Sequence, residues 1–211
     1  IGLSKLSLYA LVEGEKVINE LDTPLDASTF TDVAGHWALE AIAFVVENGL
    51  FNGTSETTFG PNAPMDRGMF VTVLGRLAKI DATAYTATPF TDVKAGAYYA
   101  PYAAWASENK IVEGVGGGLF APANQITRQE MAAMLIRYAD FAKIALTGAE
   151  QASFADDAEI AAWAKGGVYA LASAGILNGV GDGNFAPKKT AIRAEVATML
   201  MRFARLSPVT Q

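Results

Sequence analysis

The chain has 211 residues, of which 51% are hydrophobic and 18% are charged, so it can bury a sizeable core and is not disordered in composition. Its formal net charge of -6 gives no general electrostatic attraction to nucleic acid or to an anionic membrane surface. It contains no cysteine, which excludes a disulfide framework, thiolate metal sites and cysteine nucleophiles.

Residues 1–29 precede the patterned part of the chain. Segments 6–11 and 16–21 flank Glu13-Gly14-Glu15 and predict a β-hairpin, although a helix or the end of a preceding domain fits as well. The chain begins at Ile1, so we expect a mature fragment of a longer protein. Its apolar runs are far shorter than the roughly 20 residues of a membrane helix, and we expect no membrane insertion.

From residue 30 onward one pattern occurs three times, over residues 30–88, 89–152 and 153–211. Each copy opens with a phenylalanine and an aspartate, has a second phenylalanine two residues before a proline, and places an arginine eight residues after that phenylalanine. A second arginine follows nine residues later. The aspartates are Asp32, Asp92 and Asp156, the second phenylalanines Phe59, Phe120 and Phe185, and the first arginines Arg67, Arg128 and Arg193.

Each copy contains two helical patterns. The first starts at Trp37, Tyr98 or Trp163 and has side chains for one helix face four, seven and eight residues later, before it ends near residues 48, 109 and 174. The second starts at the first arginine, with apolar residues three, six, seven and ten positions on. A loop of about a dozen residues separates the two helices, and long ordered loops tend to be functional. We therefore predict an all-α fold of three helical-hairpin repeats, with the second helices around a common axis and residues 30–206 as one compact unit.

The arginine at each second-helix start is a candidate anion site. Helix starts carry unsatisfied N–H groups and a partial positive charge, and arginine grips a carboxylate with two parallel hydrogen bonds. Thr127 and Glu130 also form a capping-box pattern, so Glu130 and Glu195 are interpreted as structural. The second arginines, half a turn around the helix, are interpreted as solvated or paired with acids; they are Arg76, Arg137 and Arg202.

Other repeated positions leave two interpretations open. The aromatic residues that open the first helices could belong to the core or form sugar platforms. The three aspartates could be N-caps of the first helices or could contact a ligand. A glycine recurs between the helices, either for positive φ or for close approach to a ligand. These glycines are Gly53, Gly114 and Gly179.

The motif Ile126-Thr127-Arg128-Gln129-Glu130, with the preceding Phe-x-Asp and Phe-x-Pro elements, resembles the S-layer homology repeat. The third copy keeps Arg193-Ala194-Glu195 but has Ile192 before it, and the first copy departs most, with Asp66-Arg67-Gly68-Met69. The resemblance covers residues 30–206. From this departure we expect the Arg128 site to be best formed, the Arg193 site next and the Arg67 site last.

The resemblance implies a pseudo-threefold arrangement around a central three-helix bundle, with grooves between neighbouring repeats. It also implies binding of a secondary cell-wall polysaccharide attached to peptidoglycan, often through a sugar that carries a pyruvate ketal. The expected role is to anchor the remainder of a parent surface protein in the extracellular envelope, most often of a Gram-positive bacterium. The arginines, aromatics, aspartates and glycines named above are its candidate ligand-binding residues.

Two other function classes compete with wall anchoring. An enzyme is not favoured, because the one histidine, His36, has no counterpart in the other copies and there is no cysteine, which speaks against a catalytic triad or a metal site. We expect no catalytic residue, metal or cofactor. A protein–protein interaction module in a surface assembly stays open as the alternative.

Overall fold

The computed structural model describes residues 27–149 and 153–206, so the hairpin predicted within residues 1–29 lies outside the described residues apart from 27–29. In the described part the fold is all-α, as predicted, with isolated bridges but no strands. No described helix is both long enough and apolar enough to cross a membrane. The α-helices are α1 Leu39–Glu47, α2 Arg67–Leu77, α3 Ala100–Glu108, α4 Arg128–Ala142, α5 Ala162–Ser173 and α6 Arg193–Leu206; the 3-10 turns are η1 Ala27–Thr29, η2 Ala82–Ala84 and η3 Asp157–Glu159.

The second helix of each repeat begins at its arginine, as the sequence predicts. Thr127 accepts from the Glu130 N–H while the Glu130 side chain accepts from the Thr127 N–H, which completes the capping box of α4. Asp66 caps α2 by accepting from the Met69 N–H at 2.6 Å. The first helices differ slightly from prediction: α1 and α3 begin two residues after their aromatic residue, and α5 begins one residue before Trp163.

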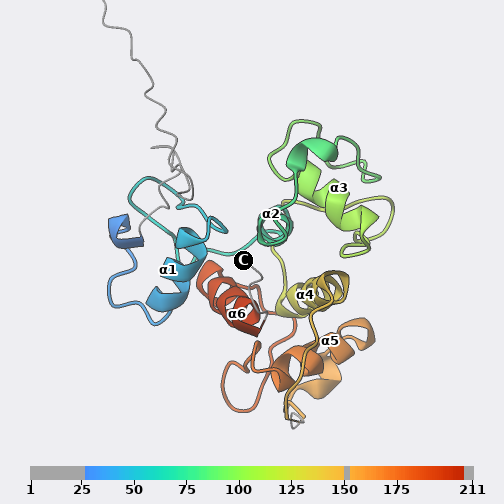
Figure 1. Cartoon of the computed structure of the whole chain (residues 1–211). Helices are drawn as coiled ribbons and strands as arrows, with labels where there is room; N and C mark the ends of the chain where they lie inside the picture. The colour runs from blue at the N-terminus through green and yellow to red at the C-terminus, as the bar shows by residue number, and fades with distance from the viewer. Residues whose placement is uncertain (1–26, 150–152, 207–211) are drawn as a thin grey trace, which may run out of the picture.

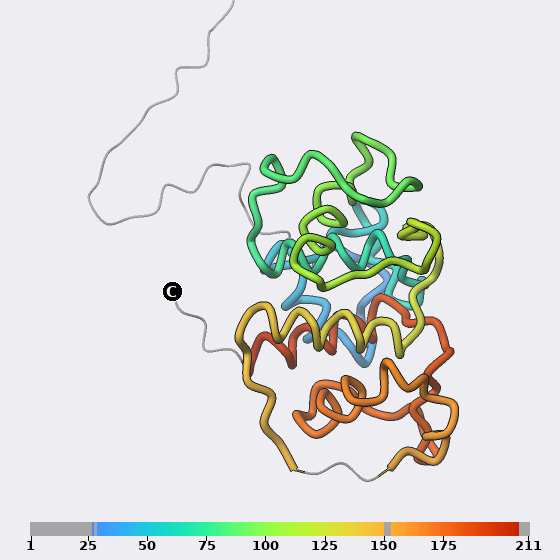
Figure 2. The backbone as a smooth tube through the Cα atoms, turned by 90° about the vertical axis from the view of Figure 1, so that its right-hand side faces the viewer, coloured from blue at the N-terminus to red at the C-terminus, as the bar shows by residue number. Residues whose placement is uncertain are grey.

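The helices pair across repeats. α3 packs on α2, α5 packs on α4, and α1 packs on α6, whereas in the described chain no α-helix pairs with the other α-helix of its own repeat. The expected hairpins are therefore not independent units, because the main helix pairs join neighbouring repeats; within the second repeat α3 and α4 touch through Trp105 and Phe141, whose ring centroids lie 5.6 Å apart. Figure 1 shows α2, α4 and α6 around the middle of the molecule and α1, α3 and α5 outside them. Figure 2 shows α4 and α6 crossing the middle, between α3 above and α5 below.

A closed cycle of backbone hydrogen bonds joins the three repeats in front of their second helices. The Met65 N–H donates to Ala191 at 2.9 Å, the Ala191 N–H donates to Ile126 at 3.0 Å, and the Ile126 N–H donates to Met65 at 2.9 Å. All three residues are fully buried. Because buried backbone groups need partners, each repeat satisfies one neighbour and is satisfied by the other.

The core consists of the predicted apolar stripes and the loop phenylalanines. In α2 the stripe residues Phe70, Val73 and Leu74 are buried and Leu77 is half-buried; the stripes of α4 and α6 are buried throughout. The loop phenylalanines Phe59, Phe120 and Phe185 are 0% exposed. Burying one such side chain is worth about 1.5–3 kcal/mol before the entropy cost of ordering it, so each phenylalanine anchors its loop to the core.

Candidate functional site

Each repeat's aspartate holds the phenylalanine loop of its own repeat. The two carboxylate oxygens of Asp32 accept from the N–H groups of Phe59 and Gly60, both at 2.8 Å. Asp92 and Asp156 do the same for Phe120-Ala121 and Phe185-Ala186. The N-cap interpretation was therefore wrong, since a carboxylate matches the two adjacent N–H groups of the loop.

The carbonyl of the same phenylalanine accepts from a buried arginine of another repeat. Arg193 Nε donates to Phe59 O at 3.0 Å, and its guanidinium lies 4.5 Å from the centre of that ring. The equivalent Nε bonds are Arg67 to Phe120 at 2.9 Å and Arg128 to Phe185 at 2.8 Å. Each arginine thus ties two repeats together through a loop that an aspartate has positioned.

The helix-start arginines are buried, with exposures of 3%, 4% and 7% for Arg67, Arg128 and Arg193. Arg128 Nη2 also donates to Asn178 O at 2.6 Å, and Arg193 Nη2 donates to Asn52 O at 2.7 Å. Burial lowers the pKa of all three, that of Arg193 to about 10. Much of each guanidinium is therefore committed to the fold, and only its remaining N–H groups are available to a ligand.

The helix starts themselves are not open anion sites. The N–H of Arg67 donates to Asn124 O at 3.0 Å and the N–H of Gly68 donates to Pro122 O at 2.9 Å. The same two bonds recur at the starts of α4 and α6, each time to the next repeat in the cycle. Because these N–H groups already have carbonyl partners, the expectation that they would hold an anion is wrong.

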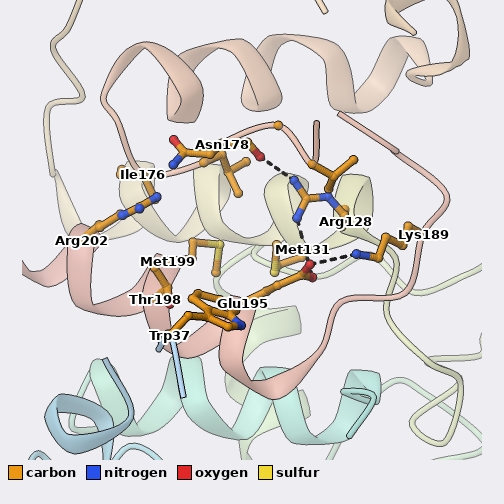
Figure 3. A pocket seen from close by; sticks show the side chains of 13 residues that line it. Trp37, Arg128, Met131, Ile176, Asn178, Lys189, Glu195, Thr198, Met199 and Arg202 are labelled. Atoms are coloured by element: carbon orange, nitrogen blue, oxygen red, sulfur yellow. Dashed lines mark hydrogen bonds and ion pairs between the residues drawn. The ribbon is translucent and has the colours of Figure 1, made fainter. Parts of the chain in front are cut away.

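Three cavities lie where the repeats meet, and each takes residues from all three. The first, the Trp37 groove, has a volume of about 400 Å³, within the range of small-molecule sites. Figure 3 shows Arg202 on one side of it, Arg128 and Lys189 on the other, and Trp37 beside Glu195. Its lining includes Trp37 from the first repeat, Arg128 from the second, and Asn178, Gly179, Lys189, Glu195 and Arg202 from the third.

The other two cavities repeat this composition in rotated order. The Tyr98 groove, of about 290 Å³, includes Tyr98 from the second repeat, Arg193 from the third, and Asn52, Gly53, Met69 and Arg76 from the first. The Trp163 groove, of about 500 Å³, includes Trp163 from the third repeat, Arg67 from the first, and Glu113, Gly114, Glu130 and Arg137 from the second.

The three aromatic residues are surface groups. Trp37, Tyr98 and Trp163 are 64%, 57% and 57% exposed, so the core interpretation is wrong for all three. Each ring stands at a groove that also holds two arginines, which is an arrangement suited to a sugar face with an anionic substituent. The aspartates do not line the grooves. They act on the grooves only indirectly, by fixing the loop whose carbonyl accepts a hydrogen bond from the buried arginine.

The recurrent groove positions are glycine for steric reasons. Gly53 and Gly179 do not have positive φ, and only Gly114 does, at 80°. A Cβ at Gly53 would overlap the Ser55 carbonyl and the Phe30 ring, and one at Gly179 would lie 2.6 Å from Asn184 O. Positive φ is therefore not the shared reason for glycine; the absence of room for a side chain is.

The second arginines are groove residues that sequence reasoning missed. Arg137 lies nine residues after Arg128, which is half a turn around α4, so the two face opposite sides of the helix. Arg128 consequently lines the Trp37 groove and Arg137 the Trp163 groove. The regular spacing of nine residues was the available signal, but it points to a groove only once the helix is known to separate two grooves.

Comparison with known proteins agrees with the repeat pattern. Residues 29–68, 89–132 and 153–197 match the family model of the S-layer homology domain. The chain is 34% identical over 82% of its length to an amylopullulanase of Thermoanaerobacterium thermosulfurigenes, and equally to the exoglucanase XynX of Acetivibrio thermocellus. It is 30% identical over 82% of its length to the S-layer protein sap of Bacillus anthracis. It spans only 9%, 16% and 21% of these relatives.

Proposed function

This chain belongs to the S-layer homology domain family, and we propose that it anchors a larger surface protein non-covalently to the bacterial cell wall by binding a secondary cell-wall polysaccharide. The matched relatives include S-layer proteins and polysaccharide-degrading enzymes, and in each the matching region is a small part of the protein. One attachment module shared by proteins of such different activity fits anchoring better than catalysis. We place this chain in the envelope of a Gram-positive bacterium.

The observation that carries the proposal is the repeated groove composition. Each groove pairs an exposed aromatic ring with one buried and one half-buried arginine, although the chain as a whole is acidic. A ring can stack on a sugar face, and the arginines can hold a carboxylate such as that of a pyruvate ketal. A charge-assisted hydrogen bond contributes about 1.5–3 kcal/mol, enough to retain an anion against an overall charge of the same sign.

The test is calorimetric titration of the chain with purified wall polymer, before and after removal of its ketal pyruvate. Tyr98→Ala removes an exposed ring and Arg76→Gln a half-buried cation of one groove, and we expect each to weaken binding. Arg205→Gln is the control, because Arg205 pairs with Glu40 on the surface and lines none of the three grooves. Binding that survives pyruvate removal would leave anchoring but reject the carboxylate. Binding to purified S-layer protein and not to polymer would replace the proposal with the protein–protein alternative.

A further inference from the structure

The three grooves differ in charge. The Tyr98 groove is lined by Arg76 and Arg193 and by no carboxylate. The Trp37 groove has three cationic side chains and one glutamate. The Trp163 groove has two arginines and two glutamates, so its lining is neutral. An anionic ligand therefore meets net positive charge in two grooves and none in the third.

Both arginines of the Trp163 groove are paired with glutamates. Arg137 Nη2 lies 2.7 Å from Glu113 Oε2, and Arg67 Nη1 lies 3.2 Å from Glu130 Oε1. An incoming carboxylate would have to displace Glu113 from Arg137 and would remain beside its charge. Because like charges repel and each arginine already faces a glutamate, this groove is the poorest place for an anion.

Glu113 is the residue that makes the difference. The position before the groove glycine is Asn52 in the first repeat and Asn178 in the third, both neutral. Asn178, in the amide orientation that satisfies both groups, accepts from Arg202 at 3.0 Å and leaves the arginine charge uncompensated. In the Tyr98 groove Arg76 donates to the carbonyl of Leu50 at 3.1 Å, again without a carboxylate.

The Arg67 site keeps its expected last place, but for a different reason. The glutamate that faces a helix-start arginine comes from the following repeat, as Glu130 does for Arg67 and Glu195 does for Arg128. The glutamate missing at Met69 is therefore missing from the Arg193 groove, not from the Arg67 groove. The Arg67 site still ranks last, because its groove holds two carboxylates rather than because its own repeat lacks one.

We propose that the Trp37 and Tyr98 grooves bind the anionic sugar, whereas Glu113 closes the Trp163 groove to anions and leaves it to neutral sugar units. This inference rests on the proposed function, since it assigns charge preference among the same three grooves. The chain would then have two grooves that each bind an anionic sugar. Two linked contacts on one polymer strengthen attachment well beyond either alone.

The groove tryptophans report on two of the sites separately. Trp37 and Trp163 are exposed, while Trp105 is 1% exposed and serves as an internal reference. The ¹⁵N-labelled chain is titrated with a methyl glycoside carrying a 4,6-pyruvate ketal and with the same glycoside lacking it, while the three indole N–H signals are followed. Tyr98→Trp adds an indole in the remaining groove.

We expect the ketal glycoside to shift the indole signals of Trp37 and of the tryptophan introduced by Tyr98→Trp. The affinity read from the Trp163 signal should be at least about tenfold lower. Glu113→Asn introduces the residue of the other two repeats, and because the Glu113 side chain is 70% exposed the packing stays intact. It should raise the affinity of the Trp163 groove for the ketal glycoside about tenfold. Glu159→Asn, which removes the same charge outside the grooves, should not.

The outcomes separate the two proposals. Equal affinities of the Trp37 and Trp163 grooves for the ketal glycoside, or no change in Glu113→Asn, would overturn the charge assignment and leave anchoring intact. If no groove indole responds to either glycoside and the wall polymer does not bind, the proposed function falls, and this inference falls with it.

Discussion

Arg193 serves the fold and the groove with different parts of one side chain. Its Nε and Nη2 atoms donate to Phe59 O and Asn52 O, and its guanidinium stacks on the rings of Phe51 and Phe59. Arginine can do this because its five N–H donors point in fixed directions. A lysine, with a compact ammonium group, could not donate to both carbonyls and also present donors to the groove.

Arg193→Ala should therefore unfold more easily, quite apart from any effect on binding. The substitution leaves the buried carbonyl of Phe59 and the partly buried carbonyl of Asn52 without their arginine donor, and we expect a loss of about 2–4 kcal/mol in the free energy of unfolding, measured by urea denaturation. Arg205→Ala, at an exposed ion pair, should change it by less than about 0.5 kcal/mol. Equal stabilities of the two variants would contradict the holding role of Arg193.

The lowered pKa of Asp32 should make the stability of the fold depend on pH. Burial raises its pKa, but the N–H groups of Phe59 and Gly60 and the charge of Arg193 outweigh this and lower it below 3.8. The folded state thus binds the proton less readily than the unfolded state, and the stability gained at neutral pH is lost as pH falls below about 3.8. Asp32→Asn should be less stable than the unaltered chain at pH 7, with a difference that narrows at pH 3. A constant difference would exclude this origin.

At the scale of elements, helix pairs across repeats depend on small residues at the contact. A Cβ at Gly167 of α5 would lie 2.8 Å from Ile136 Cγ2 of α4, whereas one at Gly166 would have nothing within 4 Å. In α2, a Cβ at Gly75 would overlap the Tyr102 ring of α3. Gly75 and Gly167 therefore weaken their own helices intrinsically but let the partner helices approach, whereas Gly166 has no such role.

Two neighbouring substitutions in α5 should have opposite signs. Gly166→Ala removes the backbone entropy cost of glycine without a clash and should stabilise the chain by about 0.5–1 kcal/mol. Gly167→Ala gives the same helix benefit but forces Ile136 to move, and should destabilise it. Thermal unfolding of both variants measures the difference, and stabilisation by Gly167→Ala would show that the α4–α5 contact is looser than described.

The sequence predicts helix ends better than helix partners. The starts at Arg67, Arg128 and Arg193 follow from local capping chemistry and apolar spacing, and the structure confirms them. The pairing of α1 with α6 could not be predicted, because a long loop does not fix which helix a stripe packs against. The contact of each aspartate with its own loop could not be predicted for the same reason: the N–H groups that it accepts from lie 27 to 30 residues away rather than in the adjacent helix.

At the scale of the whole molecule, the repeats close into a ring. The ring is closed by the backbone cycle through Met65, Ile126 and Ala191 and by the α1–α6 pair. It therefore has no terminal repeat that could be removed without breaking contacts on both of its sides. Stability should therefore not be a sum over independent repeats, as it is in open arrays. Closure also means that every groove needs residues from all three copies.

A fragment of residues 27–149 should accordingly lack both cooperative unfolding and wall-polymer binding. It leaves α1 without α6, α4 without α5, and no groove complete. Circular dichroism on heating and calorimetry with the polymer measure the two properties. Adding a second chain with residues 153–206 should restore both in part. A fragment that binds the polymer alone would show that one groove works without the third repeat.

The mixed origin of each groove bears on how such a chain can diverge after gene duplication. Three separate identical chains joined in the same ring would present three identical grooves, and every mutation would alter all of them together. Once three copies share one chain, Met69 alters the Tyr98 groove and Glu113 alters the Trp163 groove independently. A fused trimer can thus keep one scaffold while its three grooves come to prefer different sugars along a single polymer.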